Sequence, residues 1–352
     1  MRIAWTKSLQ GIGIAYGYSN HQAQLQRALL NNGVIFDDNA PVQVSLIPAG
    51  GFVPIPGKYN VLYTMFESTD IPPSWIPKVN QADLIVVPCE HNRKVFQRFT
   101  KKPVVVCLEG TKTDMFTYKE RKFETPFNFL WFGASNQRKG YVHVIYAWNE
   151  LKRRFPEIAK NCRLYMKTTQ TNDAERIIGY ENGEPITQKM PAERVFTADD
   201  VTVDTRKVSE EELVKMYHDS HCFLFPTMGE GFGLTLAEAM STGMPCIYTP
   251  WSGPVDFCSH KEGYKLKFRI APVTADFASC GGKATDNYKT FAATADIKDL
   301  TNKMVQVYSD YDNALIKGKR AAERIRKEIT WDISANRLMD IIRQYTEGAI
   351  AC

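Results

Sequence analysis

The stretch that decides the fold of this chain reads HCFLFPTMGEGFGLTLAEAMSTGMPC and spans residues 221–246. Its first part, His221 to Pro226, is a short apolar run typical of a buried strand. Leu234 to Thr242 reads as a helix that is closed by Gly243. In an open α/β sheet, ligands bind at the carboxyl edge of the strands, where a strand runs into the following helix. The loop between these two elements is therefore expected to face a ligand.

That loop carries glycines at 229, 231 and 233, with two glutamates eight residues apart, Glu230 and Glu238. Glycines let backbone N–H groups approach an anion at the positive N-terminus of a helix, which favours a phosphate. The groups expected to contact it are Gly231, the N–H groups of Phe232, Gly233 and Leu234, and the amide and hydroxyl of Thr235.

The two carboxylates suit sugar hydroxyls. Glu230 precedes the helix and is expected to accept hydrogen bonds from a hexose. Glu238, one turn inside the helix, is expected to accept both hydroxyls of a ribose. The alternative is that Glu238 faces solvent and that the glycine-rich loop is an ordinary turn.

Length and composition indicate a globular protein with two domains. A chain of 352 residues exceeds what one core usually fills, and it has no run of ~20 apolar residues that would cross a membrane. The N-terminus lacks the pattern of a signal peptide, so a cytoplasmic location is expected. The eight cysteines are scattered without a C-x-x-C pair, which favours free thiols and no zinc site.

Strand-like and helix-like segments alternate along the chain, as in a doubly wound parallel sheet. A polar stretch up to residue 122 precedes a new apolar strand at 127–132, so we expect the domain boundary there. Residues 171–192 and 272–294 show no readable pattern. The expected strands are 2–6, 42–47, 61–66, 84–88, 104–108, 127–132, 163–167, 221–226 and 245–248, and the expected helices are 20–32, 90–99, 142–155, 210–220, 234–242, 297–309, 313–327 and 331–345.

The sequence EGFGLTLAEAMSTGMPCI at 230–247 resembles the nucleotide-sugar signature of the GT4 glycosyltransferases. Two further segments resemble the family in the expected order: FLWFG at 129–133, followed by Arg138-Lys139-Gly140, and WDISA at 331–335. The resemblance implies a GT-B fold, in which two Rossmann-like domains face each other across a cleft. Residues 1–122 would bind the acceptor and 123–330 the nucleotide sugar, while a C-terminal helix within 331–352 crosses back to the first domain.

The resemblance also implies the reaction. A retaining enzyme of this kind moves a hexose from a UDP- or GDP-sugar to a hydroxyl acceptor, and the nucleoside diphosphate sugar is a co-substrate rather than a cofactor. Glu230, Lys139 and Arg138 are the expected catalytic group, with Lys139 and Arg138 on the diphosphate. Many family members carry an arginine where this chain has Ala134, and Arg138 is expected to replace it. The alternative for Arg138-Lys139 is an exposed helix start.

No metal ion is expected, because the D-x-D at 310–312 lies between helices and away from any strand end. In the first half, Gly11 and Gly13 are expected either to face the donor or to form a flexible turn. Glu67 and Asp70 are acceptor-binding candidates, although Asp70 also suits a cap for the segment around Pro72-Pro73. His91 is expected either to meet a substrate or to be a surface histidine at a helix start.

The acceptor stays open. A glycan, a lipid-linked glycan, a protein and a modified nucleic acid all fit, and basic runs within the net charge of +5 would suit a peripheral membrane contact. One alternative function is transfer to a polyanion such as hydroxymethylated phage DNA. Another, of a different class, is a non-catalytic module that binds a sugar nucleotide or a glycan.

Overall fold

The computed structural model describes residues 1–6, 16–168, 175–181, 184–189, 195–273 and 288–346. The first sheet has six parallel strands in the order β2-β1-β3-β4-β5-β6. Its strands are β1 (Arg2–Trp5), β2 (Ile35–Phe36), β3 (Val42–Leu46), β4 (Tyr59–Tyr63), β5 (Leu84–Val87) and β6 (Val104–Val106), and its helices are α1 (Tyr16–Asn31), α2 (Ile76–Val79) and α3 (Glu90–Gln97).

The second sheet has seven strands in the order β11-β12-β8-β7-β13-β14-β15. All neighbours in it are parallel except β11 and β12. Its strands are β7 (Phe127–Phe132), β8 (Cys162–Lys167), β11 (Val195–Ala198), β12 (Val201–Asp204), β13 (Cys222–Phe225), β14 (Cys246–Tyr248) and β15 (Tyr264–Lys265). The helices around it are α4 (Tyr141–Arg154), α5 (Pro156–Ala159), α6 (Glu210–His218), α7 (Leu234–Ser241), α8 (Ile297–Ser309) and α9 (Tyr311–Glu328).

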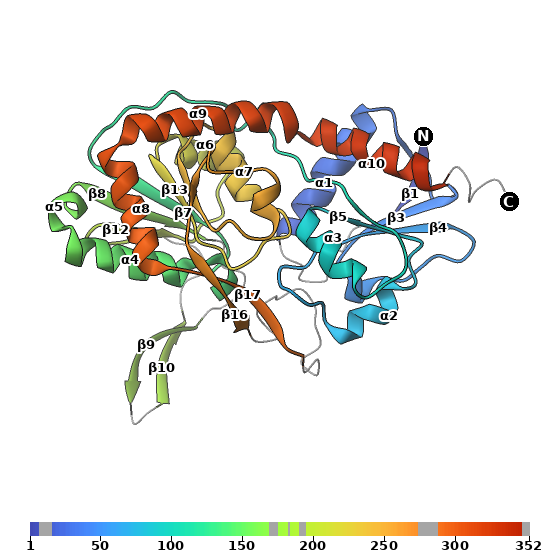
Figure 1. Cartoon of the computed structure of the whole chain (residues 1–352), viewed down its shortest axis with the longest axis horizontal. Coiled ribbons are helices and arrows are strands. Elements are labelled where there is room, and N and C mark those ends of the chain that lie inside the picture. The colour runs from blue at the N-terminus through green and yellow to red at the C-terminus, as the bar shows by residue number, and fades with distance from the viewer. Residues whose placement is uncertain (7–15, 169–174, 182–183, 190–194, 274–287, 347–352) are drawn as a thin grey trace.

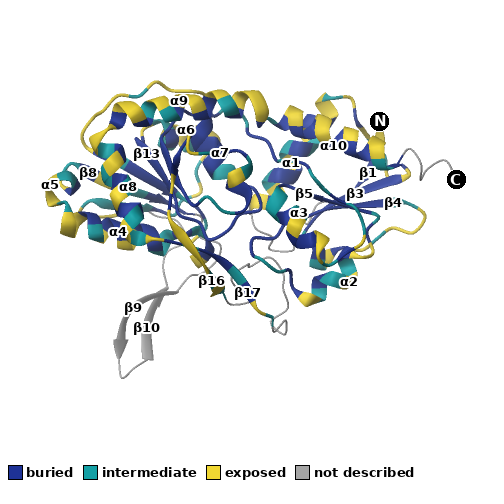
Figure 2. Cartoon of the chain, in the orientation of Figure 1, coloured by how far each residue is buried: buried dark blue, intermediate teal, exposed yellow. Residues whose placement is uncertain are grey.

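We call the first sheet with α1–α3 and the C-terminal helix the N-terminal unit, and the second sheet with α4–α9 the C-terminal unit; the two lie side by side in Figure 1. The inner strands of both sheets are largely buried, whereas the edge strands β2 and β11 and the outer faces of the helices carry exposed residues (Figure 2). One apolar core fills the N-terminal unit, and two cores lie in the C-terminal unit. The two Rossmann-like sheets expected from the alternating pattern are confirmed.

The C-terminal helix α10 (Trp331–Thr346) packs on α1, as expected. Leu338 and Ile342 are buried in the core of the N-terminal unit, so the chain returns to that unit after α9. Residues 110–111 and 330–331, the two crossings between the units, run alongside each other, joined by a parallel bridge between Thr111 and Thr330. The predicted boundary after residue 122 precedes β7 and stays a prediction.

Two antiparallel hairpins lie in or beside the segments without a readable pattern, 171–192 and 272–294. They are β9 (Glu175–Glu181) with β10 (Glu184–Lys189), and β16 (Phe268–Val273) with β17 (Thr290–Ala295). The first projects from the C-terminal unit in Figure 1, and the second runs toward the N-terminal unit. Of the helices within the described ranges, none combines the length and the apolar character that crossing a bilayer requires.

The crossing between the units predicts a sensitive glycine. A Cβ at Gly110 would overlap the backbone of Thr330 and Trp331, whereas one at Gly51 would meet nothing within 4 Å. Gly110→Ala is therefore expected to lower the free energy of unfolding by about 1–3 kcal/mol, as other overpacked sites do. Urea unfolding of both alanine variants measures this, and equal stability of the two would contradict the packing at the crossing.

Candidate active site

The predicted site centres on the carboxylate of Glu230, in the loop between β13 and α7. The Lys139 ammonium lies 2.9 Å from Oε1 and 2.8 Å from Oε2 of this carboxylate. Arg138 donates from Nη1 to Glu230 Oε2 at 3.1 Å and to the Gly229 carbonyl at 2.8 Å. Glu230 and Arg138 are buried, whereas the Lys139 side chain is 21% exposed. Lys139 is thus the more accessible of the two cations.

The turn after β7 places both cations. A 3-10 turn at Gln137–Lys139 begins at Asn136, whose side chain accepts a hydrogen bond from the Lys139 amide at 3.2 Å. The indole of Trp131, inside β7, donates to the Lys139 carbonyl at 3.0 Å. Because the turn is fixed at both ends, Arg138 and Lys139 project toward the adjacent end of β13.

A second loop, after β14, fixes the backbone of Glu230. The Glu230 amide donates to the Ser252 hydroxyl at 2.9 Å, and the Gly253 amide donates to the Glu230 carbonyl at 3.1 Å. Ser252 is buried and has a φ of 58°, which is costly for a residue other than glycine. The sequence gives no signal for this role, since the contact depends on where β14 ends in space.

The N-terminus of α7 opens at the same edge of the sheet. Gly233 has a φ of 115° and no side chain caps the helix. Phe232 and Gly233 are buried, and Leu234 and Thr235 are half-buried. The amides of the first turn of a helix have no partner within the helix, and a buried helix end needs another partner for them. This end of α7 is therefore prepared for an anion.

Glu238 lies one turn further into α7, where its carboxylate is buried. Tyr217 of α6 donates to Glu238 Oε2 at 2.9 Å, and its hydroxyl also lies 3.3 Å from the Thr235 carbonyl. Burial raises the pKa of Glu238 to about 7, while the Tyr217 hydrogen bond and the charge of Lys112 oppose that shift. The alternative of a solvent-facing Glu238 is not what the structure has. Tyr217 has no recognisable signature in the sequence.

Glu67, after β4, reaches this cluster from the N-terminal unit. Its Oε1 lies 3.5 Å from Arg138 Nη2, and its Oε2 is buried with no hydrogen-bond partner among the described residues. A Cβ at Gly229 would overlap the Glu67 carbonyl, so the two units touch here. Gly231 lies against Met65 in the same contact.

The other candidates of the N-terminal unit lie near this contact. Asp70 pairs with Arg98 at 3.0 Å and accepts from the Thr69 hydroxyl, and it does not cap the following 3-10 turn. His91 Nε2 lies 3.1 Å from the Ser68 carbonyl and its ring lies 4.7 Å from that of Trp251, so it is not a free surface side chain. Burial lowers the pKa of His91. Gly11 and Gly13 lie outside the described residues.

The structure thus gathers Glu230, Lys139, Arg138 and Glu67 in one cluster. Within the part of the chain that the structure describes, no group of three or more His, Cys, Asp and Glu side chains is placed to hold a metal ion. The six described cysteines, 89, 107, 162, 222, 246 and 258, are buried and free, and Cys280 and Cys352 lie outside the described residues.

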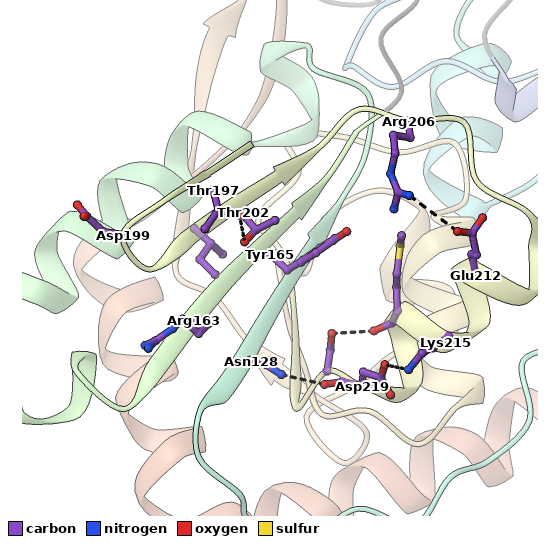
Figure 3. Close-up of a pocket in the computed structure, with 13 residues that line it drawn as sticks. Asn128, Arg163, Tyr165, Thr197, Asp199, Thr202, Arg206, Glu212, Lys215 and Asp219 are labelled. Atoms are coloured by element: carbon purple, nitrogen blue, oxygen red, sulfur yellow. Dashed lines mark hydrogen bonds and ion pairs between the residues drawn. The ribbon is translucent and has the colours of Figure 1, made fainter. Parts of the chain in front are cut away.

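A separate cavity of about 510 Å³ lies between α6 and the strands β7, β8 and β12 (Figure 3). Arg206, Lys215 and Tyr165 line it, but their polar groups are already engaged. Arg206 and Tyr165 both contact Asp204, at 2.8 and 2.7 Å, and Lys215 pairs with Asp219. This cavity contains none of the predicted site residues.

Part of the chain, including Lys139, Glu230 and Glu238, matches a known protein family. Residues 114–276, a little under half of the chain, match the family described as Glycosyl transferases group 1. The chain is 28% identical over 146 residues to sucrose synthase 4 of Oryza sativa subsp. japonica, and 28% identical over 124 residues to sucrose synthase of Nitrosomonas europaea. These alignments cover 41% and 35% of this chain but only 16% and 13% of the relatives, so the chain matches about a sixth of their length or less.

Solved structures match nearly the whole fold. Sucrose-phosphate synthase of Thermosynechococcus elongatus has a TM-score of 0.63 at 14% identity, covering 95% of this chain and 80% of that one. WaaG, a glycosyltransferase involved in lipopolysaccharide biosynthesis, has a TM-score of 0.62 at 11% identity, covering 97% and 99%. HepE of Anabaena, in complex with UDP and glucose, has a TM-score of 0.61 at 10% identity, covering 97% and 98%.

These matches, together with the two facing Rossmann-like sheets, show that the chain has the GT-B fold. Residues 114–276 are thus similar to the Glycosyl transferases group 1 family, GT4, whose members are retaining enzymes. The fold expected from residues 129–140, 230–247 and 331–335 is confirmed, and residues 129–140 and 230–247 lie inside the segment that matches the family.

The buried carboxyl of Glu238 predicts a pH-dependent stability. Its ordinary pKa of 4.5 applies to the unfolded chain, and the folded pKa is about 7. The folded state therefore binds this proton more tightly than the unfolded state does. The resulting contribution to the free energy of unfolding is complete below pH 4.5 and is lost as the pH rises through 7. Glu238→Gln removes this loss.

Compared with the wild type, Glu238→Gln is expected to be relatively more stable at pH 8 than at pH 5. Urea unfolding at both pH values measures the two differences in free energy. If the free energy of unfolding differs between the variant and the wild type by the same amount at pH 5 and pH 8, burial does not raise the pKa of Glu238.

Proposed function

We propose that this chain is a glycosyltransferase that moves a hexose from a UDP- or GDP-sugar to a hydroxyl acceptor, without a metal ion. The observation that carries the proposal is the uncapped, half-buried N-terminus of α7 at the same sheet edge as Lys139 and Arg138. A diphosphate placed there would accept hydrogen bonds from the first-turn amides and a positive charge from Lys139. These groups would stabilise the negative charge that develops on the departing diphosphate.

Lys139 and Arg138 would then have different roles. The Lys139 side chain is partly exposed, and its four-carbon chain is flexible. Its ammonium can therefore move from Glu230 to the diphosphate. Arg138 is buried and also holds the Gly229 carbonyl, which favours it as the group that keeps Glu230 in place. The departure of Lys139 would free both oxygens of Glu230 for hydroxyls of the hexose.

No carboxylate nucleophile is assigned. Glu230 is held by two cations, and its carboxylate oxygens are suited to accepting hydrogen bonds. In the proposed step, the acceptor oxygen bonds to the anomeric carbon on the face that the diphosphate leaves. The bond from that carbon to the phosphate oxygen breaks, and this oxygen takes the acceptor proton. Glu238 holds the ribose at the other end of the donor.

The N-terminal unit is proposed to bind the acceptor. Glu67 supports this, because its buried Oε2 lacks a hydrogen-bond partner among the described residues and would accept one from an acceptor hydroxyl. The bound UDP and glucose in the HepE structure support a UDP-hexose as the donor. The acceptor class, a cytoplasmic location and a peripheral membrane contact stay predictions.

A thermal-shift panel of UDP- and GDP-hexoses identifies the donor first. A ligand at a hundred times its dissociation constant stabilises the protein by ~2.7 kcal/mol, which a melting curve resolves. Calorimetric titration of the matching nucleoside diphosphate into Lys139→Met is then expected to show about 10- to 100-fold weaker binding, since a charge-assisted contact is lost. Lys152→Met, the same change on the outer face of α4, serves as the control.

Unchanged affinity in Lys139→Met, with the control also unchanged, would remove Lys139 from the donor site. Failure of every nucleotide sugar and diphosphate to shift the melting curve would contradict the proposed function as a whole.

A further inference from the structure

The hairpin β16–β17 begins in the C-terminal unit but packs into the N-terminal one. At its base, Ala295 lies in the core of the C-terminal unit, and the Asp296 side chain caps α8 by accepting from the Asp299 amide at 2.9 Å. Three residues before Ala295, Ala292 is fully buried in the core of the N-terminal unit. β17 is therefore a short strand whose two ends belong to different cores (Figure 1).

The first residues of β17 are hydrogen-bonded to the loop after β4. The Thr69 amide donates to the Phe291 carbonyl at 3.0 Å, and the Phe291 amide donates to the Thr69 hydroxyl at 3.0 Å. Thr290 donates from its hydroxyl to the Ser68 hydroxyl at 2.7 Å and accepts from the Asp70 amide at 3.2 Å. Ser68 and Thr290 are both buried.

The same strand also contacts the loop of the proposed donor site. The Ala293 amide donates to the Met228 carbonyl at 3.0 Å, two residues before Glu230. Ser68, the partner of Thr290, directly follows Glu67. β17 thus holds the loop that carries Glu67 and the loop that carries Glu230 at a fixed separation, although it contains neither residue.

We propose that Thr290 is a positioning residue, which holds the two units closed so that Glu67 meets Arg138, the partner of Glu230. The inference rests on the proposed function for its effect on donor binding, but not for its effect on closure. The Thr290 hydroxyl joins the hairpin to the N-terminal unit, because it donates one hydrogen bond to that unit and accepts another from it. Opening of the units would break both of these hydrogen bonds.

The size of the effect follows from this geometry. Two hydrogen bonds of ordinary net strength together change the ratio of closed to open molecules by about tenfold or more. A ligand that binds only the closed form loses apparent affinity in proportion to the closed fraction. Thr290→Val keeps the shape of the side chain but removes its hydroxyl. Thr290→Ser keeps the hydroxyl.

The matched control is Thr294→Val, because Thr294 lies on the same strand opposite Arg269, and no hydrogen bond joins its hydroxyl to the N-terminal unit within the described ranges. Hydrogen–deuterium exchange of the ligand-free protein provides a readout that needs no substrate. Peptides covering 66–71 and 288–295 are expected to exchange about tenfold faster in Thr290→Val than in the wild type, the control or Thr290→Ser. Peptides from β5 and β13 are expected to be unchanged.

The second readout is the dissociation constant for UDP or GDP, whichever the wild type binds. It is expected to rise up to about tenfold in Thr290→Val and to return toward the wild-type value in Thr290→Ser. If the peptides covering 66–71 and 288–295 exchange at the wild-type rate in Thr290→Val, the proposal is overturned. Faster exchange throughout the protein, β5 and β13 included, would also overturn it, since it would show general destabilisation.

The two proposals fail in different ways. If no nucleotide binds the wild type, the proposed function is wrong, while the exchange data still decide whether Thr290 holds the units together. If the peptides at 66–71 and 288–295 open in Thr290→Val but UDP affinity is unchanged, closure is not linked to donor binding and the positioning role is wrong.

Discussion

The ion cluster around Glu230 is the constraint on which the rest of the site depends. Removing a carboxylate from water costs several kcal/mol unless cations and hydrogen bonds compensate for it. Here the compensation comes from Lys139 and Arg138, which follow β7, while Glu230 itself follows β13. Glu67, which follows β4 in the other unit, adds a second carboxylate beside Arg138. The cluster forms only when three strand ends from two sheets converge.

This convergence favours the proposed chemistry of binding and charge stabilisation over acid and base catalysis. Two carboxylates and two cations leave the cluster without net charge. A diphosphate that binds here adds negative charge beside the cluster. Lys139 is the accessible cation, so its ammonium is the group able to pair with that charge. Glu238 has a hydroxyl rather than a cation as its partner, and burial raises the pKa of its carboxyl to about 7. The two glutamates of one motif thus have different environments.

Much of the fold was predictable because the local pattern and the final structure agree. The helices at 297–309 and 331–346 have a clear 3.6-residue period, and the buried strands β5 and β7 are largely apolar runs bounded by turns. The site was predictable where a motif carries it, at 230–238 and 138–139. The unpredicted parts depend on distant partners. β11, β12, β16 and β17 contain polar, alanine or proline residues, and they are strands because of what they pair with.

Residue roles show the same division. Glu230 and Lys139 were predicted as members of one site, and they lie together in it. Their mutual contact, and the support from Ser252 and Tyr217, could not be predicted, because these residues meet only through tertiary packing. The expected contact of Arg138 with a diphosphate is not tested, but in the ligand-free protein its guanidinium is occupied by Glu230 and the Gly229 carbonyl.

The most direct measurement of the central claim is a crystal structure of the protein with UDP or GDP bound. The account predicts phosphate oxygens within hydrogen-bonding distance of the Gly233 and Leu234 amides, with the Lys139 ammonium moved from Glu230 onto the diphosphate and the ribose on Glu238. A nucleotide bound elsewhere, such as in the cavity beside Tyr165 and Arg206, with Lys139 still paired to Glu230, would contradict it.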